Sequence, residues 1–158
     1  EYLHHLHKSK IYKENIMAIT QGVCNSFKQE LLGGEHNLSN GGNTIKLALY
    51  KSTATLSAST TAYTATGEVS ASGQYAAKGG TLAGQQTSIS SGVALVDFAD
   101  RSFTGVTLTA RGCLIYNSTQ ANKAICVLDF GADKTATSGT FTIQFPNFTS
   151  TAAILRIS

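Results

Sequence analysis

Short apolar segments recur through the second half of this chain, and they constrain its fold more than any other feature. Gly, Ser, Thr, Asn and Asp, which favour turns, separate each segment from the next. Segments of this length and spacing predict an all-β fold, an antiparallel β-sandwich or jelly roll. The predicted strands are 93–98, 105–110, 113–116, 124–130, 140–145 and 152–157.

One further strand is predicted upstream, over residues 44–50. Its apolar and polar residues alternate, so Ile45, Leu47 and Leu49 share one face. Between the second and third of the later segments, Arg111-Gly112 predicts a turn.

One N-terminal α-helix is predicted over residues 18–32, because apolar side chains recur there every four residues. Thr20 is the expected N-cap, and Gly33-Gly34 the expected end, since glycine adopts a left-handed φ without penalty. The members of the apolar stripe are Ile19, Val23, Phe27 and Leu31.

The chain has 158 residues, and residues 17–158 are expected to form a single β-sandwich domain. Residues 52–84 contain few bulky apolar side chains and are too long for an ordinary connection. We expect an elaborated loop with short strands near 68–69 and 74–76. If the protein recognises a variable target, this loop is the expected surface.

Residues 1–16 differ from the rest, since they are polar and hold three of the four histidines. Met17, the single methionine, follows them. We expect translation to begin naturally at Met17, and residues 1–16 to be a non-native or disordered extension. The alternative is a metal site at His4, His5 and His7, but these lack carboxylate or thiolate partners nearby, so no metal is expected.

Charge excludes some functions. The net charge is +3 and 13% of residues are charged, against about 25% in a typical soluble domain. The chain has no cluster of basic residues interleaved with aromatics, so nucleic-acid binding is not predicted. No apolar run approaches the roughly 18 residues that span a membrane. A weakly charged exterior rich in Ser and Thr suits a protein that contacts other copies in an assembly.

Candidate catalytic groups have simpler structural interpretations. Asp97 and Asp129 resemble paired carboxylates, but aspartate at a strand end commonly opens a turn. Asp100 and Asp133 lack the alternating oxygen ligands of a calcium loop. His36 lies among Gly and Asn and is expected to be an exposed loop histidine. No catalytic, cofactor-binding or metal-binding residue is predicted, and the chain is not expected to be an enzyme.

The cysteines Cys24, Cys113 and Cys126 cannot all pair with one another. Cys113 and Cys126 lie in apolar runs, where a free thiol behaves as a small hydrophobic side chain. A bridge between these two is the alternative.

Three segments of the chain carry distinctive motifs: Thr109-Ala110-Arg111-Gly112-Cys113-Leu114-Ile115-Tyr116-Asn117, Leu128-Asp129-Phe130-Gly131 and Phe141-Thr142-Ile143-Gln144-Phe145-Pro146. Together these motifs resemble a group of small virion structural proteins of tailed bacteriophages, and the resemblance extends over residues 17–158. It implies a β-sandwich that decorates or cements the capsid, or belongs to the tail. It also implies other virion proteins as partners, a homo-oligomer, a location in the virion after assembly in the host cytoplasm, and no catalytic residues.

The alternative function is a tail adhesin that binds a host-surface receptor or glycan. Sugar binding favours an exposed aromatic platform. The chain has no tryptophan, and Tyr63 and Tyr75 are the aromatics of the long loop.

Overall fold

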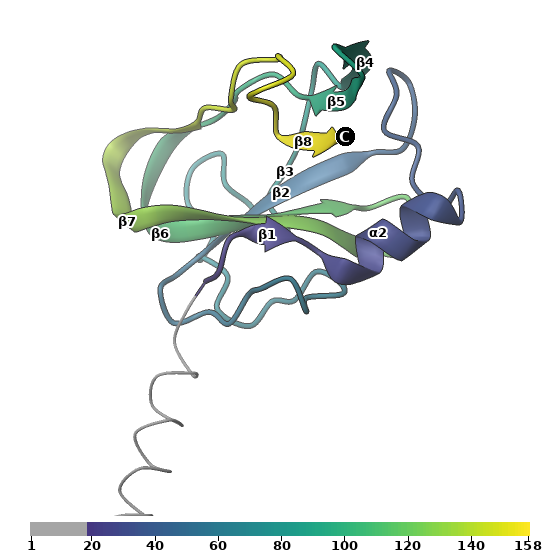
Figure 1. Ribbon diagram of the computed structural model, residues 1–158. Coiled ribbons are helices and arrows are strands. Elements are labelled where there is room, and N and C mark those ends of the chain that lie inside the picture. Colours follow the sequence, from purple (N-terminus) through teal and green to yellow (C-terminus); the bar gives the residue numbers. More distant parts are fainter. Residues whose placement is uncertain (1–18) are drawn as a thin grey trace, which may run out of the picture.

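A computed structural model describes residues 19–158 and confirms the predicted all-β class, with two antiparallel sheets and a short helix (Figure 1). The expected extension over residues 1–16 and the start at Met17 lie outside the described residues. The elements are β1 (Gly22–Val23), α2 (Asn25–Leu32), β2 (Ile45–Tyr50), β3 (Gly80–Thr81), β4 (Gln86–Ser90), β5 (Val93–Asp97), β6 (Arg101–Asn117), β7 (Lys123–Ile143) and β8 (Leu155–Ile157).

The larger sheet has the strand order β1-β7-β6-β2-β3, and the smaller sheet the order β4-β5-β8. In Figure 1 the smaller sheet lies above the larger one, and α2 lies at the right-hand end. The open ends of the β6–β7 hairpin rise at the left towards the smaller sheet. The two layers are thus joined at the left by continuous chain. A second connection, residues 82–85, runs from β3 to β4, and the Gln85 side chain donates to the carbonyls of Asn37 and Ser39 in the loop that follows α2.

The long strands β6 and β7 replace four of the predicted short ones. The turn predicted at Arg111-Gly112 is wrong, because Gly112 pairs with Asp129 inside the β6–β7 hairpin. Register shifts, one of them between Ala110 and Gly112, bend the strands where the sequence suggests that they end. The joined predictions are 105–110 with 113–116 in β6, and 124–130 with 140–145 in β7, which stops at Ile143.

The helix is shorter than the predicted range 18–32, because the first part of that range is extended. β1 pairs with β7, and the backbone N–H of Cys24 donates to the Ile125 carbonyl at 2.9 Å. These bonds to β7 replace the first helical turns, so Cys24 and not Thr20 holds the N-cap position. The predicted end is confirmed, with Gly34 at a left-handed φ of 77°.

β2 confirms the strand predicted over 44–50, but both of its faces are buried instead of one. The part of the long segment before β3, residues 52–79, runs along the lower side of the larger sheet and covers the second face (Figure 1). The short strands expected near 68–69 and 74–76 are present as isolated bridges, Glu68 with Tyr50 and Tyr75 with Ser72.

In the smaller sheet, β5 confirms the strand predicted over 93–98, and β8 forms only the second half of 152–157. β4 was not predicted, because Ile89 is its one large apolar residue. Ser91 and Gly92 join β4 to β5 with φ of 50° and 78°. Two positive φ values in a two-residue loop define a type I′ hairpin turn, which determines the register of the two strands.

All three cysteines are buried and free, as small hydrophobic side chains should be. The alternative bridge between Cys113 and Cys126 is absent. Burial, reinforced by the charge of Glu30, raises the pKa of the Cys24 thiol to about 11. That thiol therefore stays protonated near neutral pH and is a poor nucleophile.

Tyrosine hydroxyls attach the segment 52–84 to the larger sheet around the carboxylate of Glu68. That carboxylate accepts hydrogen bonds from the hydroxyls of Tyr63 and Tyr75 and from the backbone N–H of Lys78. The Tyr75 hydroxyl also accepts the backbone N–H of Leu49 at 2.7 Å. Glu68 thus has a structural role, since its oxygens order a segment that is poor in apolar side chains.

We expect this cluster to make the protein unfold in alkali. Burial raises the pKa of Tyr116 to about 12, and the pKa values of Tyr50, Tyr63 and Tyr75 further above their ordinary value. A raised pKa in the folded state contributes stability that is complete below pH ~10 and lost as pH rises above it. Circular dichroism and tyrosinate absorbance should therefore change together above pH ~10. Full ionisation of these four buried or half-buried tyrosines near pH ~10, with the circular dichroism of the folded protein unchanged, would contradict the prediction.

Candidate interaction groove

An apolar groove of about 710 Å³ opens between α2, the loop that follows it and the smaller sheet. Its volume lies within the range of ligand and partner pockets in proteins. Its lower wall includes Phe27, Leu31 and Leu32, and its upper wall Val96, Leu155 and Ile157.

The upper wall follows from strand geometry, because alternate residues of a strand share a face. The register pairs Ile89 with Ala94, and Ala94 with Ile157, so these three lie on one face of the smaller sheet. Val96 and Leu155 pair on the same face and pack against the core. This face is therefore covered at one end and open at the other.

Large apolar side chains remain exposed at the groove and beside it: Leu32 and Ile157 line it, and Ile89 lies on the sheet face that forms its upper wall. Leu32 is 91% exposed, Ile89 73% and Ile157 58%. A single exposed apolar side chain is ordinary, whereas a group of them at one apolar opening is typical of an interaction site. We call this group the apolar rim.

Below the rim, His36 is buried, and the prediction of an exposed loop histidine is wrong. Its Nε2 lies 2.6 Å from Oε2 of Glu30, on α2. Its Nδ1 lies 3.0 Å from Nδ2 of Asn117, at the end of β6. Its ring also packs on Phe27, with 4.9 Å between ring centroids. The loop residues around it are turn formers as expected, but the loop folds back onto the helix and the sheet.

The hydrogen bonds of Asn117 determine which nitrogen of His36 carries the proton. The Asn117 Oδ1 accepts the backbone N–H groups of Thr119 and Gln120, so its Nδ2 must face His36. Nδ2 donates to His36 Nδ1 and to Oδ1 of Asn43. The His36 proton therefore lies on Nε2 and is donated to Glu30. This chain of side chains connects helix, loop and sheet beneath the groove.

The aspartates predicted to be structural do not join His36. Asp129 lies within β7, not at a strand end, and pairs with Arg111 at 3.0 Å. A hydrogen bond from the backbone of Gly131, together with Arg111, holds the pKa of Asp129 below its ordinary value. Asp97 ends β5 as expected, and Asp100 accepts the backbone N–H of Phe145.

No group of three or more His, Cys, Asp or Glu that could hold a metal ion occurs within residues 19–158. The histidines His4, His5 and His7 lie outside the described residues. Within the same range, no helix is long and apolar enough to cross a membrane.

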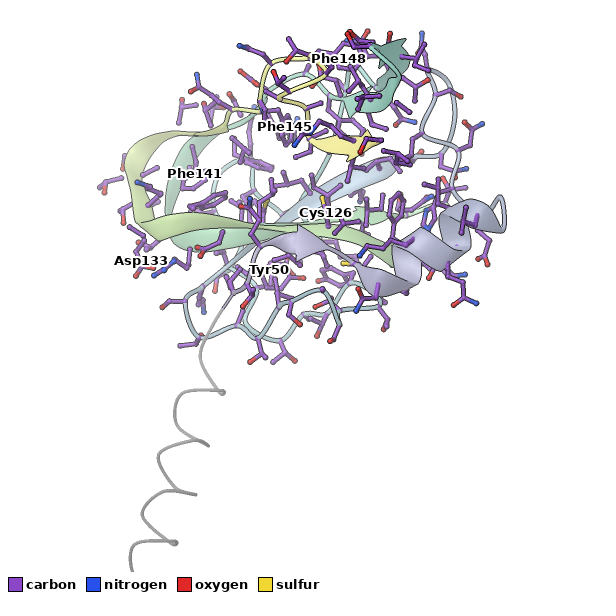
Figure 2. The ribbon with its side chains drawn as sticks, in the orientation of Figure 1. Tyr50, Cys126, Asp133, Phe141, Phe145 and Phe148 are labelled. Atoms are coloured by element: carbon purple, nitrogen blue, oxygen red, sulfur yellow. The ribbon has the colours of Figure 1, made fainter. Side chains whose placement is uncertain are left out.

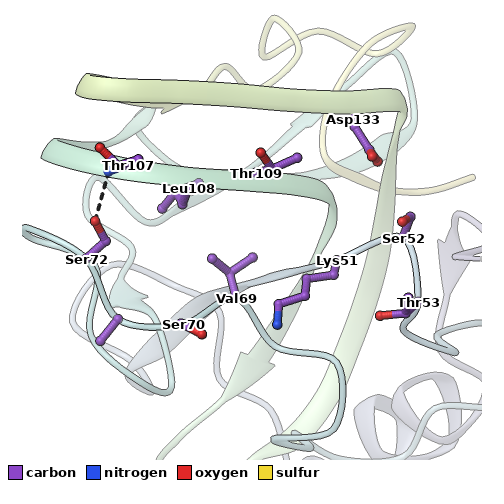
Figure 3. A pocket seen from close by; sticks show the side chains of 11 residues that line it. Lys51, Ser52, Thr53, Val69, Ser70, Ser72, Thr107, Leu108, Thr109 and Asp133 are labelled. Atoms are coloured by element: carbon purple, nitrogen blue, oxygen red, sulfur yellow. Dashed lines mark hydrogen bonds between the residues drawn. The ribbon is translucent and has the colours of Figure 1, made fainter.

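A second, polar pocket of about 480 Å³ lies between the segment 52–84 and the β6–β7 hairpin (Figure 3). Figure 2 places Asp133, which lines it, at the end of the molecule opposite to α2. In Figure 3 the Ser72 hydroxyl accepts the backbone N–H of Thr107 at its edge. The remaining polar side chains are Lys51, Ser52, Thr53, Ser70 and Thr109.

Neither tyrosine of the long loop forms the exposed platform that sugar binding favours. Tyr75 is 1% exposed and packs edge-on against Phe103. Tyr63 packs on Tyr116, with 5.2 Å between ring centroids, and its hydroxyl is bound by Glu68. The sequence around Tyr63 and Tyr75 could not reveal that both side chains turn inward.

The fold and the groove define an all-β, two-sheet protein with an apolar groove between α2 and the smaller sheet. Comparison with protein-family models, curated proteins and solved structures finds no match to this chain.

Proposed function

We propose that this protein is a non-enzymatic structural component of a tailed-bacteriophage virion, a capsid decoration or cement protein or a tail component. The apolar rim is the observation that supports the proposal, since a chain with so few charges exposes Leu32 and Ile157 in the lining of one groove and Ile89 on the sheet face that forms its upper wall. In an assembled particle, neighbouring copies or other virion proteins cover that rim. The motifs that resemble virion proteins agree with this role.

Gold-labelled antibodies on purified particles test the location. We expect label at regular positions on the capsid or the tail in negative-stain images. Particles without label, from a lysate in which the protein is abundant, would overturn the proposal.

The rim itself is tested by Leu32→Asp, which places a charge on a side chain that contributes little to the core. We expect about tenfold fewer copies per particle, because losing one buried apolar contact at an interface costs about 1.4 kcal/mol or more. Quantitative mass spectrometry of particles measures this. Thr137→Asp, on the exposed part of β7, is the matched control and should incorporate normally. Equal loss in both variants would contradict the assignment of the rim.

A second candidate function, a glycan- or receptor-binding tail adhesin, is favoured by the polar pocket of Figure 3. Its hydroxyls, with Lys51 and Asp133, offer donors and acceptors to a sugar. A glycan array tests this function. Binding that Asp133→Asn abolishes would support it, and an array without binders would count against it.

A further inference from the structure

The edges of the two sheets differ in how much free backbone they offer. Among the described residues, the edge strands β1 and β3 have two residues each and β8 has three. β4 has five, all of them exposed. It carries no charge, proline or bulge, the devices by which edge strands usually prevent pairing. β4 is therefore the unprotected edge of this fold.

The hairpin determines which backbone groups β4 presents. The type I′ turn makes Ser90 and Val93 a hydrogen-bonded pair, and such pairs alternate along antiparallel strands. Ser88 and Gln86 therefore also bond towards β5. The N–H and C=O groups of Thr87 and Ile89 point away from the sheet.

The strand is complementary to itself. A two-fold axis through Ser88 would place Thr87 opposite Ile89 of a second copy, so the outward groups of both strands meet. Two-fold pairing brings any charged side chain of the strand near the same charge on the other copy, and like charges repel. This strand avoids that repulsion, because Gln86-Thr87-Ser88-Ile89-Ser90 is uncharged. Both cross-strand pairs would join β-branched side chains, which suit a sheet.

We propose that β4 pairs antiparallel with β4 of a second copy about a two-fold axis at Ser88, which joins the smaller sheets into one of six strands. The exposed Ile89 lies on the face that forms the upper wall of the groove, so pairing also makes the two apolar faces continuous. This inference deepens the proposed function by naming the self-contact, and it rests on that function only for its place in a particle.

A disulfide across the axis tests the register. In the proposed dimer Ser88 faces its own copy as a non-hydrogen-bonded pair, with Cα atoms about 4.5 Å apart, within the range that a disulfide spans. We expect purified Ser88→Cys to form a covalent dimer under mild oxidation. Gln86→Cys, the matched control, faces Ser90 of the other copy and should stay unlinked. The native cysteines are buried and do not interfere.

Light scattering, which measures the molar mass in solution, completes the test. We expect a dimer for the unmodified chain and a monomer for Ile89→Lys. A monomer at all concentrations, or equal cross-linking of Ser88→Cys and Gln86→Cys, would overturn the pairing. Antibody labelling of particles is a separate readout, so a β4 dimer without particle label would refute the virion proposal alone.

Discussion

Asn117→Ala is expected to lower the free energy of unfolding by about 3 kcal/mol, because it leaves several polar groups without partners at once. Asn117 is fully buried. Its side chain donates to His36 and Asn43 and accepts from the backbone of Thr119 and Gln120. Each buried group left unsatisfied costs about 1–3 kcal/mol, and the loop groups recover part of this from water.

Chemical denaturation followed by circular dichroism measures the change. Asn147→Ala, in an exposed loop, is the matched control and should change stability by less than about 0.5 kcal/mol. A similar, small effect of both substitutions would show that the His36 network is not what holds the loop to the sheet. If a partner binds the apolar rim as proposed, Asn117→Ala should also weaken that binding, since the floor of the groove loosens.

Gly79→Ala is expected to cost about 2–5 kcal/mol, the second large effect in this fold. Gly79 adopts a φ of 72°, and a left-handed backbone costs other residues about 1–2 kcal/mol. A Cβ there would also lie only 1.8 Å from the Leu47 carbonyl oxygen. Relieving that overlap requires β2 to shift, and overpacking of this kind costs about 1–3 kcal/mol more.

Gly41→Ala separates the two contributions. Gly41 has nearly the same φ, 74°, but a Cβ there meets nothing within 4 Å. It should therefore lose only the backbone contribution, about 1–2 kcal/mol. Equal losses at the two positions, measured by thermal or denaturant unfolding, would mean that the chain after Tyr75 is not held against β2 as described.

The fold class and most strands of the core could be predicted from the sequence, because apolar runs and alternation reflect burial directly. The lengths of β6 and β7 could not, since Gly112 has the same local appearance in a turn and in a bent strand. β4 lacked any apolar pattern, because it lies on an edge where nothing covers its residues. The prediction of helix before Asn25 was wrong for a tertiary reason, because β1 pairs with β7 there.

The candidate site was largely hidden from the sequence. Leu31 was predicted to belong to the apolar stripe of an ordinary helix, and nothing local indicated that the smaller sheet stands open above it. His36 looked exposed because its neighbours are turn formers, yet its partners Glu30 and Asn117 lie six and 81 positions away. A single isolated histidine carries no signal of such partners.

The chain of hydrogen bonds beneath the groove has a consequence for how a partner would be recognised. His36, Glu30 and Asn117 hold the floor in one arrangement before anything arrives. A partner that docks there loses little free energy to ordering the host surface, so a modest apolar contact can suffice for affinity. A groove that binds each partner weakly suits attachment by many copies at once, where each contact adds to the total binding free energy.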